Sequence, residues 1–140
     1  MKFKGKIAIW FYAVFLLSAL FTLSTSVKAF MDGNMTAMFL DLTVFIALAL
    51  LCVPILLNNY VELKNEMLFI RFGFIRLEIP YQEIVSLTKT NNPLSSLAAS
   101  FDRIEIKRSK KGSVMIAIED KEQFLSEMQK LSPNIAIRSA

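Results

Sequence analysis

The sequence predicts an α+β protein in which two transmembrane helices precede a small antiparallel β domain that ends in a helix. Two long apolar runs in the first 57 residues, a change to alternating polarity from Tyr60 and one amphipathic stripe near the C-terminus indicate this order. The chain has 140 residues, of which 54% are apolar, a high share for a water-soluble domain of this size. We therefore assign residues 1–57 to a membrane hairpin and residues 58–140 to one folded domain, since about 80 residues bury a single core.

The first predicted span covers about residues 7–27 and contains no charged residue. About 20 apolar residues in a helix cross a hydrocarbon core of about 30 Å. The lysine-rich start and the sequence Val27-Lys28-Ala29 also fit a signal peptide that is cleaved after Ala29. The length of the run favours a retained anchor over a cleaved signal, and the cleaved form stays open as the alternative.

The second predicted span covers about residues 39–57. Its orientation follows from the basic residues that flank the two spans, because they concentrate on the cytoplasmic side of a membrane. One side carries five of them and the other carries only Lys28. The five are Lys2, Lys4, Lys6, Lys64 and Arg71. We expect a multi-pass protein of the cell membrane with both termini in the cytoplasm.

The domain that follows shows the period of a meander with one buried face, because apolar and polar residues alternate. Six strands are expected, at residues 60–64, 67–72, 74–79, 84–90, 103–108 and 113–119. Asp120 and Gln123 then form a capping-box-like helix start. An apolar stripe follows at Phe124, Leu125, Met128 and Leu131. A terminal helix with such a stripe is expected to cover the apolar face of the sheet.

The composition argues against catalysis and against cofactors. There is one cysteine and no histidine, which excludes an intrachain disulfide, histidine-based triads and the usual zinc hydrolase sites. The four glycines are isolated, so no phosphate-binding loop is present. The net charge of +4 owes more to the N-terminal lysines than to a basic face. We expect no enzyme activity, no metal, no cofactor and no nucleic-acid partner.

Residues 79–135 resemble the bacterial pleckstrin-homology-like family of small membrane proteins with two N-terminal spans. The residues that carry the resemblance are Asn92, Pro93, Ser95, Ser96, Ala98, Ser100, Asp102, Arg103, Asp120 and Phe124. Leu97 and Ala99 depart from the proline and leucine that the family usually shows. The resemblance implies a half-open PH-like β-barrel capped by the C-terminal helix. Such a barrel has seven strands, so either a further strand lies in residues 91–100 or around residues 135–137, or the barrel is incomplete.

Two candidate sites follow. The first is a ligand or partner loop that consists of Asn92, Pro93, Ser95, Ser96, Ser100, Asp102 and Arg103. Its polar side chains can also serve the local backbone, which gives a self-capped loop as the alternative. The second is a basic hairpin that faces anionic lipid, with Lys107, Arg108, Lys110 and Lys111. Its alternative is a charged turn that keeps the sheet soluble.

The function expected from this pattern is a non-enzymatic, membrane-tethered binding module. The PH-like domain would recognise a protein segment or lipid headgroups, and fold analogy suggests a role in envelope stress or bacteriocin self-immunity. The expected partners are the lipid bilayer and another membrane or cytoplasmic protein. The alternative is an accessory subunit or regulator of a membrane complex that acts through its spans.

Overall fold

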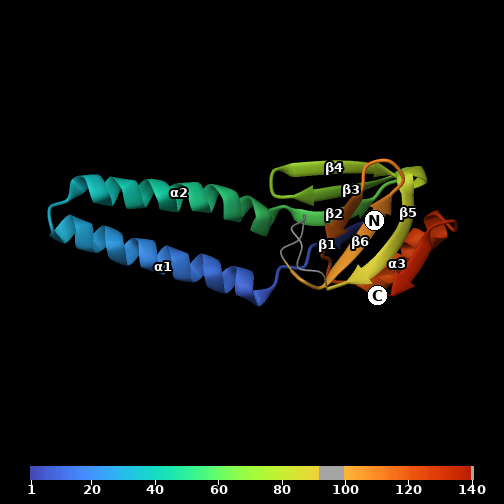
Figure 1. Cartoon of the computed structure of the whole chain (residues 1–140), viewed down its shortest axis with the longest axis horizontal. Coiled ribbons are helices and arrows are strands. Elements are labelled where there is room, and N and C mark those ends of the chain that lie inside the picture. Colours follow the sequence, from blue (N-terminus) through green and yellow to red (C-terminus); the bar gives the residue numbers. More distant parts are fainter. Residues whose placement is uncertain (92–99, 140) are drawn as a thin grey trace.

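Two helices of equal length extend side by side from one end of a β-rich domain (Figure 1). The computed structural model describes residues 1–91 and 100–139. Helix α1 covers Ile9–Met31 and helix α2 covers Met35–Leu57, each with 23 residues. Gly33 has a φ of +71° in the turn between them, and Asn34 Oδ1 accepts a hydrogen bond from Ala37 N at 3.1 Å. At 1.5 Å per residue each helix is about 35 Å long.

Both helices are long and apolar enough to cross a membrane. None of the residues in their most apolar stretches is buried inside the protein. Exposed large apolar side chains, most of them leucine, isoleucine, phenylalanine or valine, lie along both helices. A surface of this kind is stable only when lipid or another apolar partner surrounds it.

Within the described part of the chain, eight strands form two four-stranded sheets. The first has the order β1-β2-β3-β4 and is fully antiparallel. The second has the order β7-β6-β5-β8, in which β8 runs parallel to β5. Their bounds are Lys2–Lys4 (β1), Asn59–Leu63 (β2), Met67–Phe72 (β3), Ile75–Pro80 (β4), Ile84–Thr90 (β5), Arg103–Arg108 (β6), Ser113–Ile116 (β7) and Ala136–Ser139 (β8). A short 3-10 helix, Tyr81–Glu83, turns the chain from the first sheet into the second.

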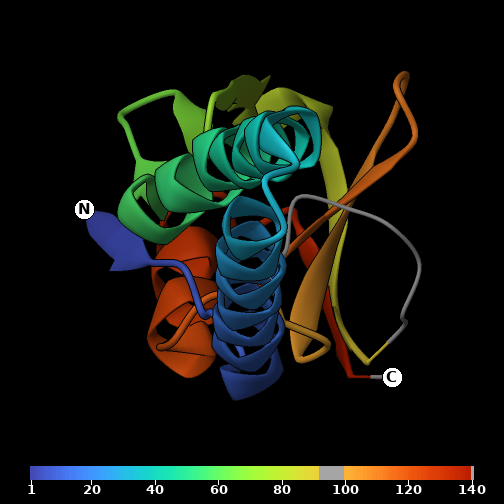
Figure 2. The ribbon, with the colours of Figure 1, turned by 90° about the vertical axis from the view of Figure 1, so that its left-hand side faces the viewer.

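The sequence does not predict strand β1, because three lysines beside an apolar run are typical of a topology signal. Strand β1 pairs with β2, and Lys4 lies opposite Tyr60. Phe3 is 4% exposed, and its ring meets the Phe124 ring edge-on at 5.4 Å. The helical hairpin is therefore inserted between the first two strands of one sheet, and the chain leaves and re-enters the domain at neighbouring strands (Figure 2).

The two sheets do not close into a complete barrel, which corresponds to the incomplete form that the sequence left open. On one side Gly5 bridges to Ile118, with hydrogen bonds from Lys6 N to Ala117 O (2.9 Å) and from Glu119 N to Lys4 O (3.1 Å). On the other side, no pairing joins β4 to β8 within residues 1–91 and 100–139. The turn that follows Pro80 separates β4 from β5, and β8 occupies the free edge of β5. Strand β8 corresponds to one of the alternatives that the sequence left open, a further strand around residues 135–137.

Helix α3, Lys121–Leu131, covers the apolar face as predicted. Phe124 and Met128 are fully buried among the β-branched side chains of both sheets. Leu131, the last residue of the predicted stripe, is exposed, because the helix ends there. Asp120 occupies the N-cap position, but its side chain makes no capping hydrogen bond, so the capping-box prediction is wrong.

Candidate functional site

The predicted ligand loop is partly described. Asn92, Pro93, Ser95 and Ser96 lie outside the described residues. At the end of the loop, Ser100 and Arg103 are each 4% exposed. Arg103 Nε donates to Ser100 O at 2.5 Å, and Asp102 N donates to Ser100 Oγ at 3.3 Å. These bonds fix the backbone just before β6 begins.

Asp102 joins three distant parts of the chain. Its Oδ2 accepts a hydrogen bond from Lys6 Nζ at 2.8 Å, and its Oδ1 pairs with Lys121 Nζ. Lys6 precedes α1, Asp102 lies before β6, and Lys121 is the first residue of α3. The carboxylate thus ties the N-terminal segment to the end of the predicted loop and to the covering helix.

The electrostatic surroundings of Asp102 favour its charged form. Partial burial alone would raise the pKa of its carboxyl, but hydrogen bonds and the charges of Lys121 and Lys6 outweigh burial and lower that pKa below the ordinary value of 3.8. Asp102 is therefore a carboxylate at neutral pH that serves both lysines. It has the character of a structural ion pair, not of a general acid.

A ring contact joins the same loop to the first turn of α1. Trp10 stacks on Phe101 with ring centroids 5.6 Å apart and planes 23° apart. The guanidinium carbon of Arg103 lies over the Phe101 ring, 5.5 Å from its centroid. The junction cluster, which we define as Lys6, Trp10, Phe101, Asp102, Arg103 and Lys121, holds the domain at the start of α1. The sequence motif contains two of these six residues, Asp102 and Arg103, and does not identify Lys6, Trp10 or Lys121 as their partners.

The basic hairpin lies at the opposite end of the domain. Arg108 binds its own turn, through Nε to Gly112 O (3.2 Å) and through Nη2 to Lys111 O (2.7 Å). Ser109 N donates to Glu83 O at 2.9 Å, beside the 3-10 helix. Strand β6 begins near α1 and at about 3.3 Å per residue carries Arg108 about 16 Å away from it. Lys107, Lys110 and Lys111 are exposed there, remote from the ends of the two helices (Figure 1).

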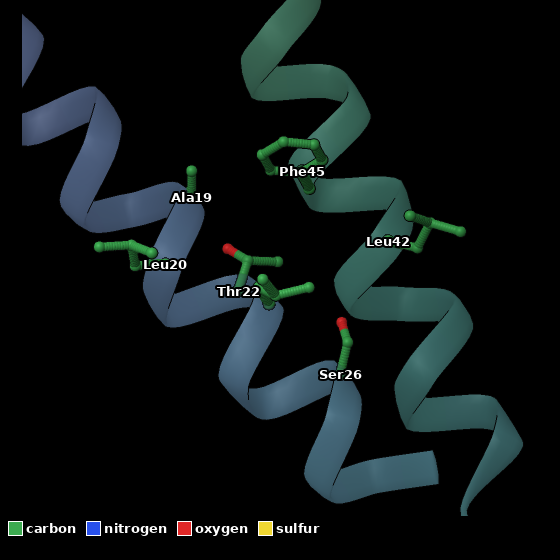
Figure 3. Close-up of a pocket in the computed structure, with 7 residues that line it drawn as sticks. Ala19, Leu20, Thr22, Ser26, Leu42 and Phe45 are labelled. Atoms are coloured by element: carbon green, nitrogen blue, oxygen red, sulfur yellow. The ribbon is translucent and has the colours of Figure 1, made fainter.

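A cavity of about 270 Å³ lies between α1 and α2 (Figure 3). Its lining residues are Ala19, Leu20, Thr22, Leu23, Ser26, Leu42 and Phe45. The hydroxyl of Thr22 donates to Ser18 O at 2.8 Å, inside its own helix. The cavity accepts an apolar group and presents no group for chemistry. Among the described residues, no cluster of carboxylate or cysteine side chains is arranged to hold a metal ion.

Two sheets with a covering C-terminal helix define a PH-like domain. Residues 59–132 match the family model described as "Bacterial PH domain". The match covers more than half of the chain, so the chain belongs to the bacterial PH domain family. It begins at β2 and ends just after α3, so β1, both long helices and β8 lie outside it. No curated protein matches the chain.

Family membership points to a non-catalytic binding module, because PH domains commonly bind proteins or lipids. Nothing in the described part of the chain indicates a reaction. The resemblance seen in residues 79–135 is thereby confirmed at the level of the family.

Replacing Asp102 by asparagine is expected to reduce the stability of the domain only above acidic pH. The folded state lowers the pKa of Asp102, so its stabilising effect is present above the ordinary aspartate value and is lost as the pH falls through the lowered value. Because the carboxylate is partly exposed, the loss at neutral pH is expected to be about 1 kcal/mol or less.

The measurement is urea unfolding of both chains across the acidic range. Asp120→Asn is the matched control, because Asp120 is exposed and makes no capping bond. The difference between wild type and Asp102→Asn should shrink toward low pH. A constant difference at every pH would show that the ion pairs do not cause it.

Proposed function

We propose that this protein is a non-enzymatic binding module that α1 and α2 hold at the inner face of the cell membrane. Its PH domain recognises a protein segment or lipid headgroups. The pairing of β1 with β2 is the observation that supports the tether most directly. Because these strands flank the helical pair, both helix ends are fixed to one side of one small domain.

The orientation follows from the charges beside the helices. Lys2, Lys4 and Lys6 precede α1, and Lys64 and Arg71 follow α2, whereas the turn side carries Lys28. The positive-inside rule then places the PH domain and both termini in the cytoplasm. Cleavage after Ala29 would remove β1 and the buried Phe3 from the domain, which favours retention of the first helix.

The ligand site that we propose is the loop that ends at Ser100, Asp102 and Arg103. The junction cluster fixes its C-terminal end against α1, so a partner bound there would lie close to the membrane surface. By fold analogy, such recognition would serve envelope stress or bacteriocin self-immunity.

A second candidate function is an accessory subunit of a membrane complex. The cavity in Figure 3 favours it, because an apolar side chain of a neighbouring helix fits between α1 and α2. Replacing Ala19 by leucine would fill this space. If the protein then no longer associates with its membrane partner, the helices and not the loop make the contact.

A photo-crosslinking amino acid at Asn91, beside the proposed loop, tests the ligand site in living cells. The matched control is Gln123, an exposed position on α3. We expect a discrete adduct at position 91 and none at position 123, and its mass distinguishes a protein from a lipid. The same adduct pattern at both positions, or none at either, would contradict a specific site at the loop.

A further inference from the structure

The tip of the β3–β4 hairpin reaches back alongside the end of α2 (Figure 1). Gly73 has a φ of +60° at the tip, and its N donates to Asn58 O at 2.8 Å. A methyl group at Gly73 would lie 3.0 Å from Ile55 Cγ1, so the tip touches the last turn of the helix. Ile55 lies two residues before the helix end at Leu57, or about 3 Å along the axis. The hairpin tip therefore lies level with the end of α2.

The tip presents apolar side chains that the domain does not cover. Phe74 is 72% exposed and Ile75 is 51% exposed. They are the two residues that follow Gly73, and Gly73 itself lies against Ile55 of α2. At this level an exposed phenylalanine ring can enter the boundary between headgroups and acyl chains, as the apolar side chains of interfacial segments do.

A transverse row of basic residues crosses the same end of the first sheet. Lys4 is opposite Tyr60, Tyr60 is opposite Arg71, and Arg71 is opposite Arg76. The row thus contains three cations and no carboxylate. Like charges directly opposite each other on neighbouring strands are destabilising unless an anion neutralises them.

Within residues 1–91 and 100–139, the two arginines have no ion-pair partner. Lys4 pairs with Glu119 at 3.3 Å, but neither Arg71 nor Arg76 makes an ion pair with any residue that the structure describes. The Nε atom of Arg71 is buried and has no hydrogen-bond partner there. A guanidinium group binds phosphate oxygens through paired N–H donors.

We propose that the β3–β4 hairpin docks on the membrane that holds the two helices. Arg71 and Arg76 bind phosphate groups of anionic lipids, and Phe74 and Ile75 enter the headgroup layer beside α2. This inference rests on the proposed tether, since only a membrane at the end of α2 brings phosphates to this level. The lipid contact is thereby assigned to the β3–β4 tip, and the basic turn at Lys110 lies at the opposite end of the domain.

Tryptophan fluorescence of the full chain in vesicles tests the docking. The background is Trp10→Phe, which removes the only tryptophan. Phe74→Trp reports on the hairpin tip, and Val85→Trp, at an exposed position near the distal end of the domain, is the matched control. In vesicles that contain brominated phosphatidylglycerol and phosphatidylcholine, Trp at position 74 should lose most of its emission. Trp at position 85 should keep most of its own.

The charge requirement is tested in the Phe74→Trp chain. Replacing Arg71 and Arg76 by glutamine should weaken quenching in the phosphatidylglycerol vesicles to the level seen with phosphatidylcholine alone. Lys107→Gln with Lys110→Gln removes the same charge at the distal turn and should leave quenching unchanged. If the double variant fails to fold, Arg76→Gln alone is the test, because Arg76 is exposed on the edge strand. This variant should weaken the quenching in part.

Two failures are distinguishable. If the protein leaves the vesicles on alkaline washing, the tether itself is contradicted. If the protein stays embedded while Trp at position 74 is as accessible to aqueous iodide as Trp at position 85, only the docking of the hairpin is contradicted. Equal quenching by neutral and anionic lipid would overturn the role of the arginines.

Discussion

Replacing Phe3 by alanine is expected to lower the free energy of unfolding of the PH domain by about 3–5 kcal/mol. Phe3 is 4% exposed and its ring packs edge-on against Phe124 under the covering helix. Its removal leaves a cavity between β1 and α3 that the remaining side chains fill only in part. The effect would be large for a residue only six positions from the start of α1.

Urea unfolding of the full chain in detergent, followed by the fluorescence of Trp10, measures this loss. Trp10 is the only tryptophan, and it stacks on Phe101 of the domain, so its emission changes when the domain unfolds. Phe21→Ala is the matched control, because Phe21 lies in α1 and is 70% exposed. Equal effects of Phe3→Ala and Phe21→Ala would show that β1 does not belong to the domain core.

The second large effect is the loss of stable folding when β1 is removed from the PH domain. A fragment of residues 58–140 lacks β1, so the edge of β2 and one side of Phe124 become exposed to water. We expect this fragment to bind hydrophobic dyes and to aggregate. A chain in which residues 6–58 are replaced by Asn-Gly should instead stay monomeric and unfold in one cooperative step. Gly5 N and Asn59 O are 2.8 Å apart, and a two-residue turn of this type connects such strands.

Thermal unfolding and gel filtration of the two chains give the comparison. The linked chain also lacks the Trp10–Phe101 contact and the Lys6–Asp102 pair, which are partly exposed and contribute little. A fragment of residues 58–140 that is as stable as the linked chain would contradict the assignment of β1 to the core.

Most of the helices and strands come from sequence segments that are long enough to show a clear hydrophobic period, so most of the fold can be predicted. Two apolar runs, six alternating segments and one helical stripe correspond to α1, α2, β2 to β7 and α3. Strand β1 has three residues, of which two are lysines, so it shows no alternation that could be recognised. The parallel placement of β8 depends on the path of the chain after α3, which local pattern does not determine.

The candidate site was predictable only in part, for a related reason. The motif identified Asp102 and Arg103, but the partner Lys6 is 96 positions away in sequence. Contacts at such separation depend on how β1 enters the sheet. The arginine row is similar, because Arg71 and Arg76 become neighbours only through the register of β3 and β4. Sequence spacing alone predicts the turn at Lys110 as the lipid-facing site.

Cysteine labelling in intact cells tests most directly whether α1 and α2 hold the PH domain on the cytoplasmic side of the membrane. Cys52→Ser removes the only native thiol, and single cysteines then replace Asp32, in the turn between the helices, or Ser109, in the distal turn of the domain. A membrane-impermeant maleimide should label position 32 in whole cells and position 109 only after the membrane is opened. Labelling of position 109 in whole cells, or of neither position before opening and both after it, would contradict a two-helix tether with an inward-facing domain.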